Sequence, residues 1–176
     1  QTHYIQEQVK SIPIDPKRAG SPDSPCTPEE VAKLRACAGV VNWVTTQTRA
    51  DCAYRISSVC GQIGRNPTVA TILEYNERAD ILLNEEMVLK FKRVGNSALD
   101  FSLLIHHDSA FGNASNDGSQ AGLVIGAVPK GMVTQKSYYK LGDTLVPWVP
   151  IFWKSNRLHR VARSTFCAET LECSGI

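Results

Sequence analysis

The sequence contains no run of about 18 consecutive apolar residues, which is the length that a membrane-spanning helix needs. Its polar N-terminus, QTHYIQEQVK, also has no apolar signal-peptide core. Charge of one sign is not in excess, because the formal net charge is only +2, so the total charge does not indicate a polyanionic partner. What remains is an ordinary globular composition, 43% hydrophobic and 20% charged, in a chain long enough to bury a real core.

The six cysteines form no CxxC pair and show no metal-finger spacing, which excludes the common zinc-binding motifs. A disulfide framework would bring more loop and less helical pattern than this sequence has. We therefore expect buried, reduced thiols, as is usual in an intracellular protein.

The first part of the chain divides into a predicted linker and a predicted helical segment. Residues 1–26 are rich in Pro, Ser and Asp, which predicts an extended linker. Residues 27–86 predict a helical connection segment. Thr27 can cap its first helix, Pro28 suits the first helical position, and Glu30 closes a capping box.

Two further helices are predicted in this segment, the first capped by Asp51 and the second beginning at Asn66-Pro67. Gly39 lies inside the first helix, where we expect it to allow close contact with another helix. Apolar residues at helical spacing predict the buried faces of the three helices. They are Val31, Leu34, Cys37, Ala38, Val41, Val44 and Thr45, then Cys52, Ile56, Val59, Cys60 and Ile63, then Val69, Ile72, Leu73, Ala79 and Leu83.

After Asn84 the hydrophobic period changes from helical to alternating. The pattern predicts a short strand at Met87–Phe91, a strand with one apolar face at Leu99–His107, and a hairpin turn ending in Asn116-Asp117-Gly118. A strand buried on both faces (Ala121–Val128), an edge strand (Trp148–Trp153, beside Pro147 and Pro150) and a helix opening at Ser164-Thr165 follow. The predicted fold class is α+β: a helical segment, then an antiparallel three-stranded meander and a helix.

A basic stretch follows the last predicted strand and predicts a cationic loop. Lys154, Arg157, Arg160 and Arg163 occur at a spacing of three, with no Asp or Glu among them. Such a loop can hold a polyanion. The alternative is a solvated loop whose long side chains cover apolar surface.

Two carboxylates flank this stretch in the predicted topology. Asp108 follows a predicted strand, a position that holds a metal ligand rigidly, and Glu169 lies one turn into the predicted helix. The alternatives are that Asp108 only begins a turn and that Glu169 faces solvent. His106 and His107 are possible ligands or proton relays, or simply half-buried residues at a strand end.

Four segments in series resemble copia-type retrotransposon polyproteins. Residues 34–51 (LRACAGVVNWVTTQTRAD) resemble the "LR..aGsL.Wla.QTRPD" segment that follows the reverse transcriptase core, and Asp108-Ser-Ala-Phe resembles the "DASF" that opens the ribonuclease H region. Ser119-Gln120-Ala-Gly122 is similar to "SQ.GyvI", and residues 152–170 are similar to "isW.S.K..RV.RSTlaAEt". The resemblance runs from about residue 27 to the C-terminus.

The resemblance implies that residues 87–176 form the N-terminal part of a ribonuclease H-like domain, with three antiparallel strands before a helix. It implies Asp108 and Glu169 as catalytic carboxylates and ligands of Mg²⁺, in hydrolysis of the RNA strand of an RNA–DNA hybrid. The implied partners are that hybrid and the rest of the polyprotein, in a cytoplasmic particle or the nucleus, without a membrane or a small-molecule cofactor. From their charge, we expect Lys154, Arg157, Arg160 and Arg163 to contact the nucleic-acid backbone.

The sequence departs from the family pattern at several positions. Ala50 stands where the family usually has Pro, and Phe166-Cys167 replaces smaller or acidic residues. The family's later carboxylates follow a further strand and helix, beyond Ile176. We therefore expect a fragment with half an active site, inactive alone. The alternatives are a nucleic-acid-binding remnant that does not cut, and a structural domain in which Asp108 and Glu169 never meet.

Overall fold

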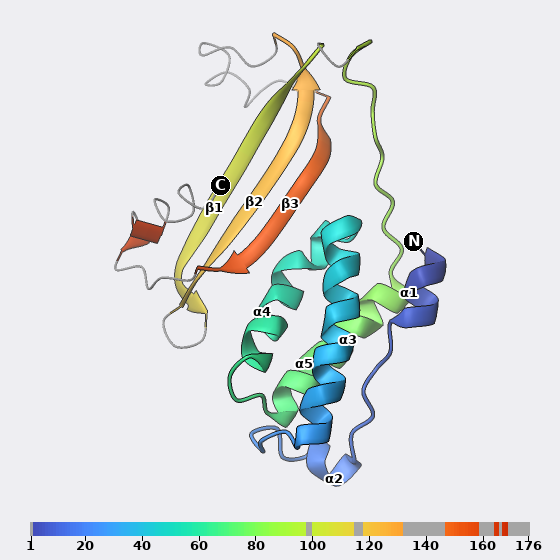
Figure 1. The fold of residues 1–176 in the computed structure, drawn as a ribbon, viewed down its shortest axis with the longest axis vertical. Coiled ribbons are helices and arrows are strands. Elements are labelled where there is room, and N and C mark those ends of the chain that lie inside the picture. The colour runs from blue at the N-terminus through green and yellow to red at the C-terminus, as the bar shows by residue number, and fades with distance from the viewer. Residues whose placement is uncertain are drawn as a thin grey trace. The chain divides into compact units, whose positions relative to one another are not determined.

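The computed structural model describes residues 2–97, 100–114, 118–131, 147–158, 164–165 and 167–168. The chain divides into two compact units. The helical unit is Gln1–Met87 together with Ser155–Arg157, and the β unit is the remainder of the chain, which holds the rest of the sheet. Figure 1 shows the helices and the strands of these units, which are described separately below.

The helical unit contains five α-helices and one short 3-10 helix among its described residues. They are α1 (Thr2–Gln8), α2 (Pro16–Ala19), α3 (Pro28–Gln47), η1 (Ala50–Cys52), α4 (Ala53–Ile63) and α5 (Val69–Asn84). The three long helices α3, α4 and α5 pack against one another, in agreement with the three helices predicted for this region.

The start of α3 confirms the predicted capping box. The Glu30 N–H donates to the Thr27 hydroxyl (3.2 Å), and the Thr27 N–H donates to the Glu30 carboxylate (2.8 Å). Pro28 occupies the first turn, where its missing N–H costs nothing. Glu30 also forms an ion pair with Arg18 (2.8 Å), so the cap of α3 is joined to the preceding α2.

The starts of α4 and α5 differ from the prediction. Asp51 does not cap α4, because a 3-10 turn precedes that helix and the Asp51 carboxylate instead binds Arg49 (2.8 Å). Helix α5 begins at Val69 rather than at Asn66-Pro67. There the Thr68 N–H donates to the Thr71 hydroxyl (3.3 Å), which supplies the polar cap that selects this start.

Gly39 does not mediate a close helix contact, so that expectation is wrong. The residue is exposed, and a Cβ added to it would meet nothing within 4 Å. The cost of glycine inside α3 is therefore not offset by packing at this position.

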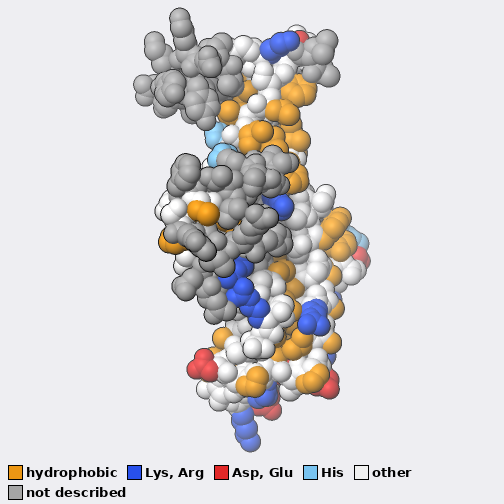
Figure 2. All heavy atoms as spheres, turned by 60° about the vertical axis from the view of Figure 1, so that its left-hand side comes forward, with side chains coloured by type: hydrophobic (Ala, Val, Ile, Leu, Met, Phe, Trp, Pro, Cys, Tyr) orange, Lys and Arg blue, Asp and Glu red, His pale blue; other side chains and the backbone are white. Residues whose placement is uncertain are grey.

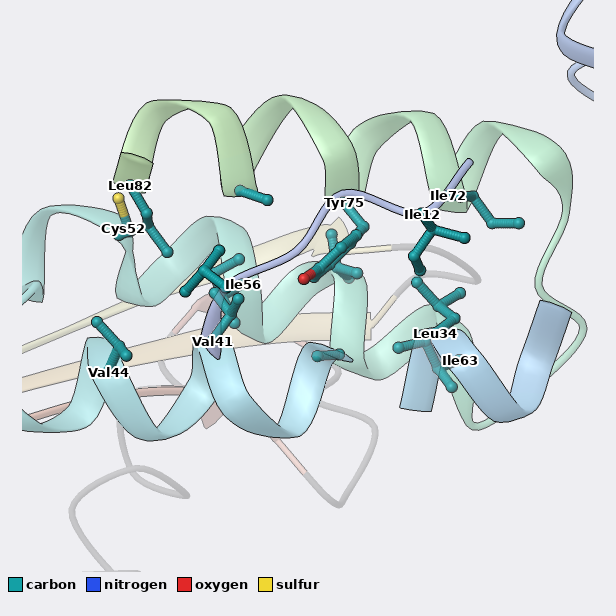
Figure 3. Close-up of a cluster of buried hydrophobic side chains, with 14 of the residues drawn as sticks. Ile12, Leu34, Val41, Val44, Cys52, Ile56, Ile63, Ile72, Tyr75 and Leu82 are labelled. Carbon is teal, nitrogen blue, oxygen red and sulfur yellow. The ribbon is translucent and has the colours of Figure 1, made fainter. Parts of the chain in front are cut away.

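The core of the helical unit confirms most of the predicted buried positions. Leu34, Val41, Ile56 and Ile72 are fully buried, and Figure 3 shows their side chains converging between the helices. Leu73 was wrongly placed in the core and is exposed, because α5 turns Tyr75 and Leu82 inward instead. An aromatic ring with a polar tip was not expected at the centre of this core.

The N-terminal residues are not the extended linker that their composition predicted. Residues 2–8 form α1, and Ile5, Val9 and Ile12 belong to the buried core cluster of the helical unit. Their spacing of four and then three places them on one side of the segment, which outweighs the Pro and Ser content around them.

The β unit is one antiparallel sheet of three strands in the order β1-β2-β3, which confirms the α+β class and the meander. The strands are β1 (Phe101–Ala114), β2 (Gly118–Pro129) and β3 (Val149–Arg157). Strands β1 and β2 pair from Phe101↔Pro129 to Ala110↔Gln120, and the register shifts before Ala114↔Gly118. Strand β2 begins at the glycine that the hairpin motif indicated.

The structure corrects two boundaries and removes one predicted strand. Strand β1 continues past His107 to Ala114, and β3 continues past Trp153 to Arg157, so Lys154 and Arg157 lie on a strand rather than in a loop. Met87–Phe91 forms no strand. Among the described residues no strand pairs with its backbone, and Val88 and Phe91 are exposed.

Candidate nucleic-acid and metal site

Asp108 lies within β1, directly opposite Gly122 of β2, and not just past a strand end as the sequence predicted. Its side chain is exposed. Because side chains alternate along a strand, Asp108 shares a face of the sheet with His106, while His107 and Ser109 belong to the other face. The position is held by hydrogen-bonded neighbours on both sides along β1, and the opposing glycine adds no side chain beside the carboxylate.

The described residues do not assemble a metal site around Asp108. Within this part of the chain, no group of three or more His, Cys, Asp or Glu residues could hold a metal ion. Mg²⁺ prefers oxygen ligands, and of the two predicted carboxylates only Asp108 lies among the described residues. The second predicted ligand, Glu169, lies outside them.

Helical backbone is present among the few described residues at the predicted helix start, at Thr165, Cys167 and Ala168. The Ser164 hydroxyl accepts a hydrogen bond from the Cys167 N–H (3.1 Å), and the Ser164 carbonyl accepts one from the Ala168 N–H (3.0 Å). Ser164 is thus an N-terminal cap, a role in which serine is common. Ala168, the residue before Glu169, is fully buried.

The basic residues do not form one row along β3. Lys154 is exposed and Arg157 is half-buried, and residues three apart on a strand point to opposite faces. Residues three apart lie on the same side of a helix but on opposite faces of a strand. The strand β3 therefore places Lys154 and Arg157 on different faces of the sheet. Arg160 and Arg163 lie outside the described residues.

Two buried groups in the sheet were missed by the sequence reasoning. The Ser119 hydroxyl accepts a hydrogen bond from the Gly112 N–H (3.2 Å) and so supports β1 where its register shifts. The indole of Trp148 lies against Gly126, where any side chain would overlap it. A Ser-Gln pair at the start of an apolar strand was the available signal for the first contact; nothing in the sequence indicated the second.

The polar residues of the Thr48-Arg49-Ala50-Asp51 motif have a structural role in the helical unit. Arg49 is only 3% exposed; its Nε and Nη2 donate to the Asp51 carboxylate (3.0 and 2.8 Å), and its Nη1 donates to the Glu85 carbonyl (2.9 Å). One guanidinium thereby ties the turn after α3 to the end of α5.

Ionisation at this motif follows from its contacts. Burial opposes the charge on Asp51, but hydrogen bonds and charge from Arg49 outweigh it and hold the pKa of Asp51 below its usual value. Burial, together with the neighbouring Asp51 charge, raises the pKa of Cys52 to about 11. The Cys52 thiol is therefore protonated at neutral pH and a poor nucleophile.

Comparison of the chain with protein-family models, with curated proteins and with solved structures found no match. The site therefore stands on its own geometry. That geometry places Asp108 and Lys154 on an antiparallel sheet and begins a capped helical turn at Ser164.

Proposed function

We propose that the chain is part of a copia-type retroelement polyprotein and that its β unit forms the first strands of a ribonuclease H-like domain. The observation that supports this is the order of its elements. A three-stranded antiparallel meander carries Asp108 on its first strand, and a helical turn capped by Ser164 follows the third strand in the sequence. This is the order that the sequence resemblance implies.

In the proposed domain, Asp108 and Glu169 are the carboxylates that would bind Mg²⁺, and the reaction is hydrolysis of RNA in an RNA–DNA hybrid. When bound, the metal would activate water and stabilise the leaving oxygen. Asp108 contributes an exposed carboxylate on a rigid strand. Because no group of three or more possible ligands forms among the described residues, we propose that this chain does not cut by itself and needs further carboxylates of the parent domain.

The second candidate function is binding of nucleic acid without cleavage. It is favoured by the exposed side chain of Lys154 on the edge strand β3, at the start of the basic stretch. Contacts of this kind go to phosphates and hold a duplex without reading its sequence. Such binding weakens as salt rises, because it releases counterions.

The test is cleavage of a labelled RNA–DNA hybrid in Mg²⁺ or Mn²⁺, with electrophoretic binding measured in parallel. The chain, Asp108→Asn and Glu169→Gln are compared, and Asp80→Asn is the matched control because Asp80 is an exposed carboxylate on α5. We expect hybrid binding without cutting by the chain alone. Extension through the next strand and helix is expected to give cutting that Asp108→Asn and Glu169→Gln abolish and Asp80→Asn spares.

Two results would contradict the proposal. Cutting by the extended chain that survives Asp108→Asn would remove Asp108 from the site. Binding without cutting in every form, extended or not, would favour the non-cleaving function instead.

A further inference from the structure

The N-terminal segment, residues 2–14, meets the helical unit in the way a bound peptide meets its receptor. The Ile12 N–H donates to Asn76 Oδ1 (2.7 Å), and Asn76 Nδ2 donates to the Ile12 carbonyl (2.8 Å). The Tyr75 hydroxyl donates to the Lys10 carbonyl (2.9 Å). In all three hydrogen bonds the segment supplies only main-chain groups, and two adjacent side chains of α5 supply the partners.

The segment also inserts three apolar side chains into the core. Ile5, Val9 and Ile12 are buried, at spacings of four and three residues. Figure 3 shows Ile12 lying next to Ile72 of α5 and Leu34 of α3. The ion pair of His3 with Glu7 stays within α1.

In many peptide-binding sites, main-chain hydrogen bonds give affinity and side-chain positions give selectivity. The contacts of residues 2–14 fall into the same two kinds. One asparagine that pairs with both the N–H and the C=O of a residue takes the place of a neighbouring strand, and it accepts any side chain at that residue. The apolar positions then select the sequence. Tyr75 and Asn76 are 65 and 64 residues away from their partners along the chain, so the interaction does not depend on local connection.

We propose that the surface of α3 and α5 that residues 2–14 contact, called the groove below, is a peptide-docking site. The chain's own residues 2–14 fill it in cis, and the same segment of a second copy fills it in trans when the cis contact is lost. The second copy is the fitting occupant because it presents identical main-chain groups and the same three apolar side chains. This inference does not rest on the proposed function of the β unit.

The test uses the full chain and a fluorescein-labelled synthetic peptide of residues 1–15, which stands for the segment of a second copy. Ile12→Asp in the chain places a charge in the groove's apolar position and so releases the cis segment. We expect the Ile12→Asp chain to bind the peptide saturably in fluorescence anisotropy. The wild-type chain should bind it at least about tenfold more weakly, because its own segment occupies the groove.

Matched variants locate the contact. Adding Asn76→Ala to the Ile12→Asp chain should weaken peptide binding by roughly tenfold, since two hydrogen bonds are lost. A peptide carrying Ile12→Asp should not bind. A peptide carrying Lys10→Ala should bind like the original, because Lys10 contributes only its carbonyl.

Circular dichroism of the Ile12→Asp chain decides the remaining outcomes. A folded variant that fails to bind the peptide would overturn the proposal. Loss of helical signal in that variant would also overturn it, because the segment would then be an indispensable part of the core rather than a ligand.

Discussion

The two units of the chain differ in how completely they bury their apolar residues. In the helical unit, three core residues have no solvent-accessible surface: Leu34, Ile56 and Ile72. The β unit leaves Leu103 57% and Ile105 43% exposed in the first half of β1. Figure 2 shows hydrophobic side chains gathered on the exposed surface of this unit. A sheet becomes stable by packing a second layer on its apolar face, so the β unit depends more on further contacts than the helical unit does.

The two units also differ in the roles of their polar residues. Polar residues of the helical unit, such as Arg49 and Asn76, hold helices and segments together. The residues with a proposed chemical role, Asp108 and Lys154, are exposed on the less buried unit. The proposed site therefore lies on the β unit, which its own packing stabilises less than packing stabilises the helical unit.

The largest expected effect comes from creating a cavity in one unit and not in the other. Ile56→Ala removes a fully buried side chain from the helical core and should lower the free energy of unfolding by about 2–5 kcal/mol. Leu103→Ala, on the exposed face of β1, should lower it by less than about 1 kcal/mol. Urea unfolding followed by circular dichroism at 222 nm checks both. Equal losses would mean that the sheet face is as well packed as the helical core.

A pair of glycines sharpens the same comparison. Gly126→Ala should destabilise the β unit by about 1–3 kcal/mol, because the new methyl group overlaps the Trp148 indole. Gly39→Ala should stabilise α3 by up to about 1 kcal/mol, because nothing lies near that position. Thermal unfolding followed by tryptophan fluorescence and circular dichroism measures both. A neutral Gly126→Ala would show that the indole moves aside.

The pH dependence of the helical unit should reflect the Arg49–Asp51 pair. The pKa of Asp51 is lower in the folded chain than in the unfolded chain, so its stabilising contribution is complete above the unfolded pKa of about 3.9. That contribution is lost as the pH falls through the lower folded pKa. Because Asp51 is partly exposed, we expect a contribution of about 1 kcal/mol or less.

Urea unfolding of the chain and of Asp51→Asn between pH 2 and pH 6 measures this contribution. The difference between the two proteins should shrink toward low pH. A difference that stays constant would exclude the ion pair as its source.

The smallest expected effect belongs to the exposed cation of the β unit. Lys154→Gln should weaken hybrid binding only a few-fold and reduce the slope of log affinity against log salt by about 1. Lys90→Gln, in the irregular segment before the sheet, is the matched control. Titrations at several salt concentrations measure the slopes. An unchanged slope in Lys154→Gln would remove this residue from the proposed contact.

Local patterns in the sequence predicted much of the fold, because local interactions produce it. The capping box of Thr27 and Glu30 needs only four consecutive residues, and the motif that predicted the start of β2 at Gly118 needs only three. The alternating pattern at Met87–Phe91 predicted a strand that does not form. The Pro and Ser content of the N-terminal segment predicted a linker, although three of its apolar residues belong to the core. For the candidate site, the sequence predicted the helical turn at Ser164, but it misjudged the end of β1 and the backbone at Lys154, and the role of Asp108 stays a prediction.

The sequence by itself therefore determined the α+β class, the three long helices, the meander and the identity of the candidate residues. Only the tertiary structure decided which of those residues share a face. It placed Asp108 within a strand and separated Lys154 from Arg157, because strand length depends on pairing with a neighbouring strand. It also docked Ile12 on Asn76, a contact between residues 64 positions apart that no local pattern encodes.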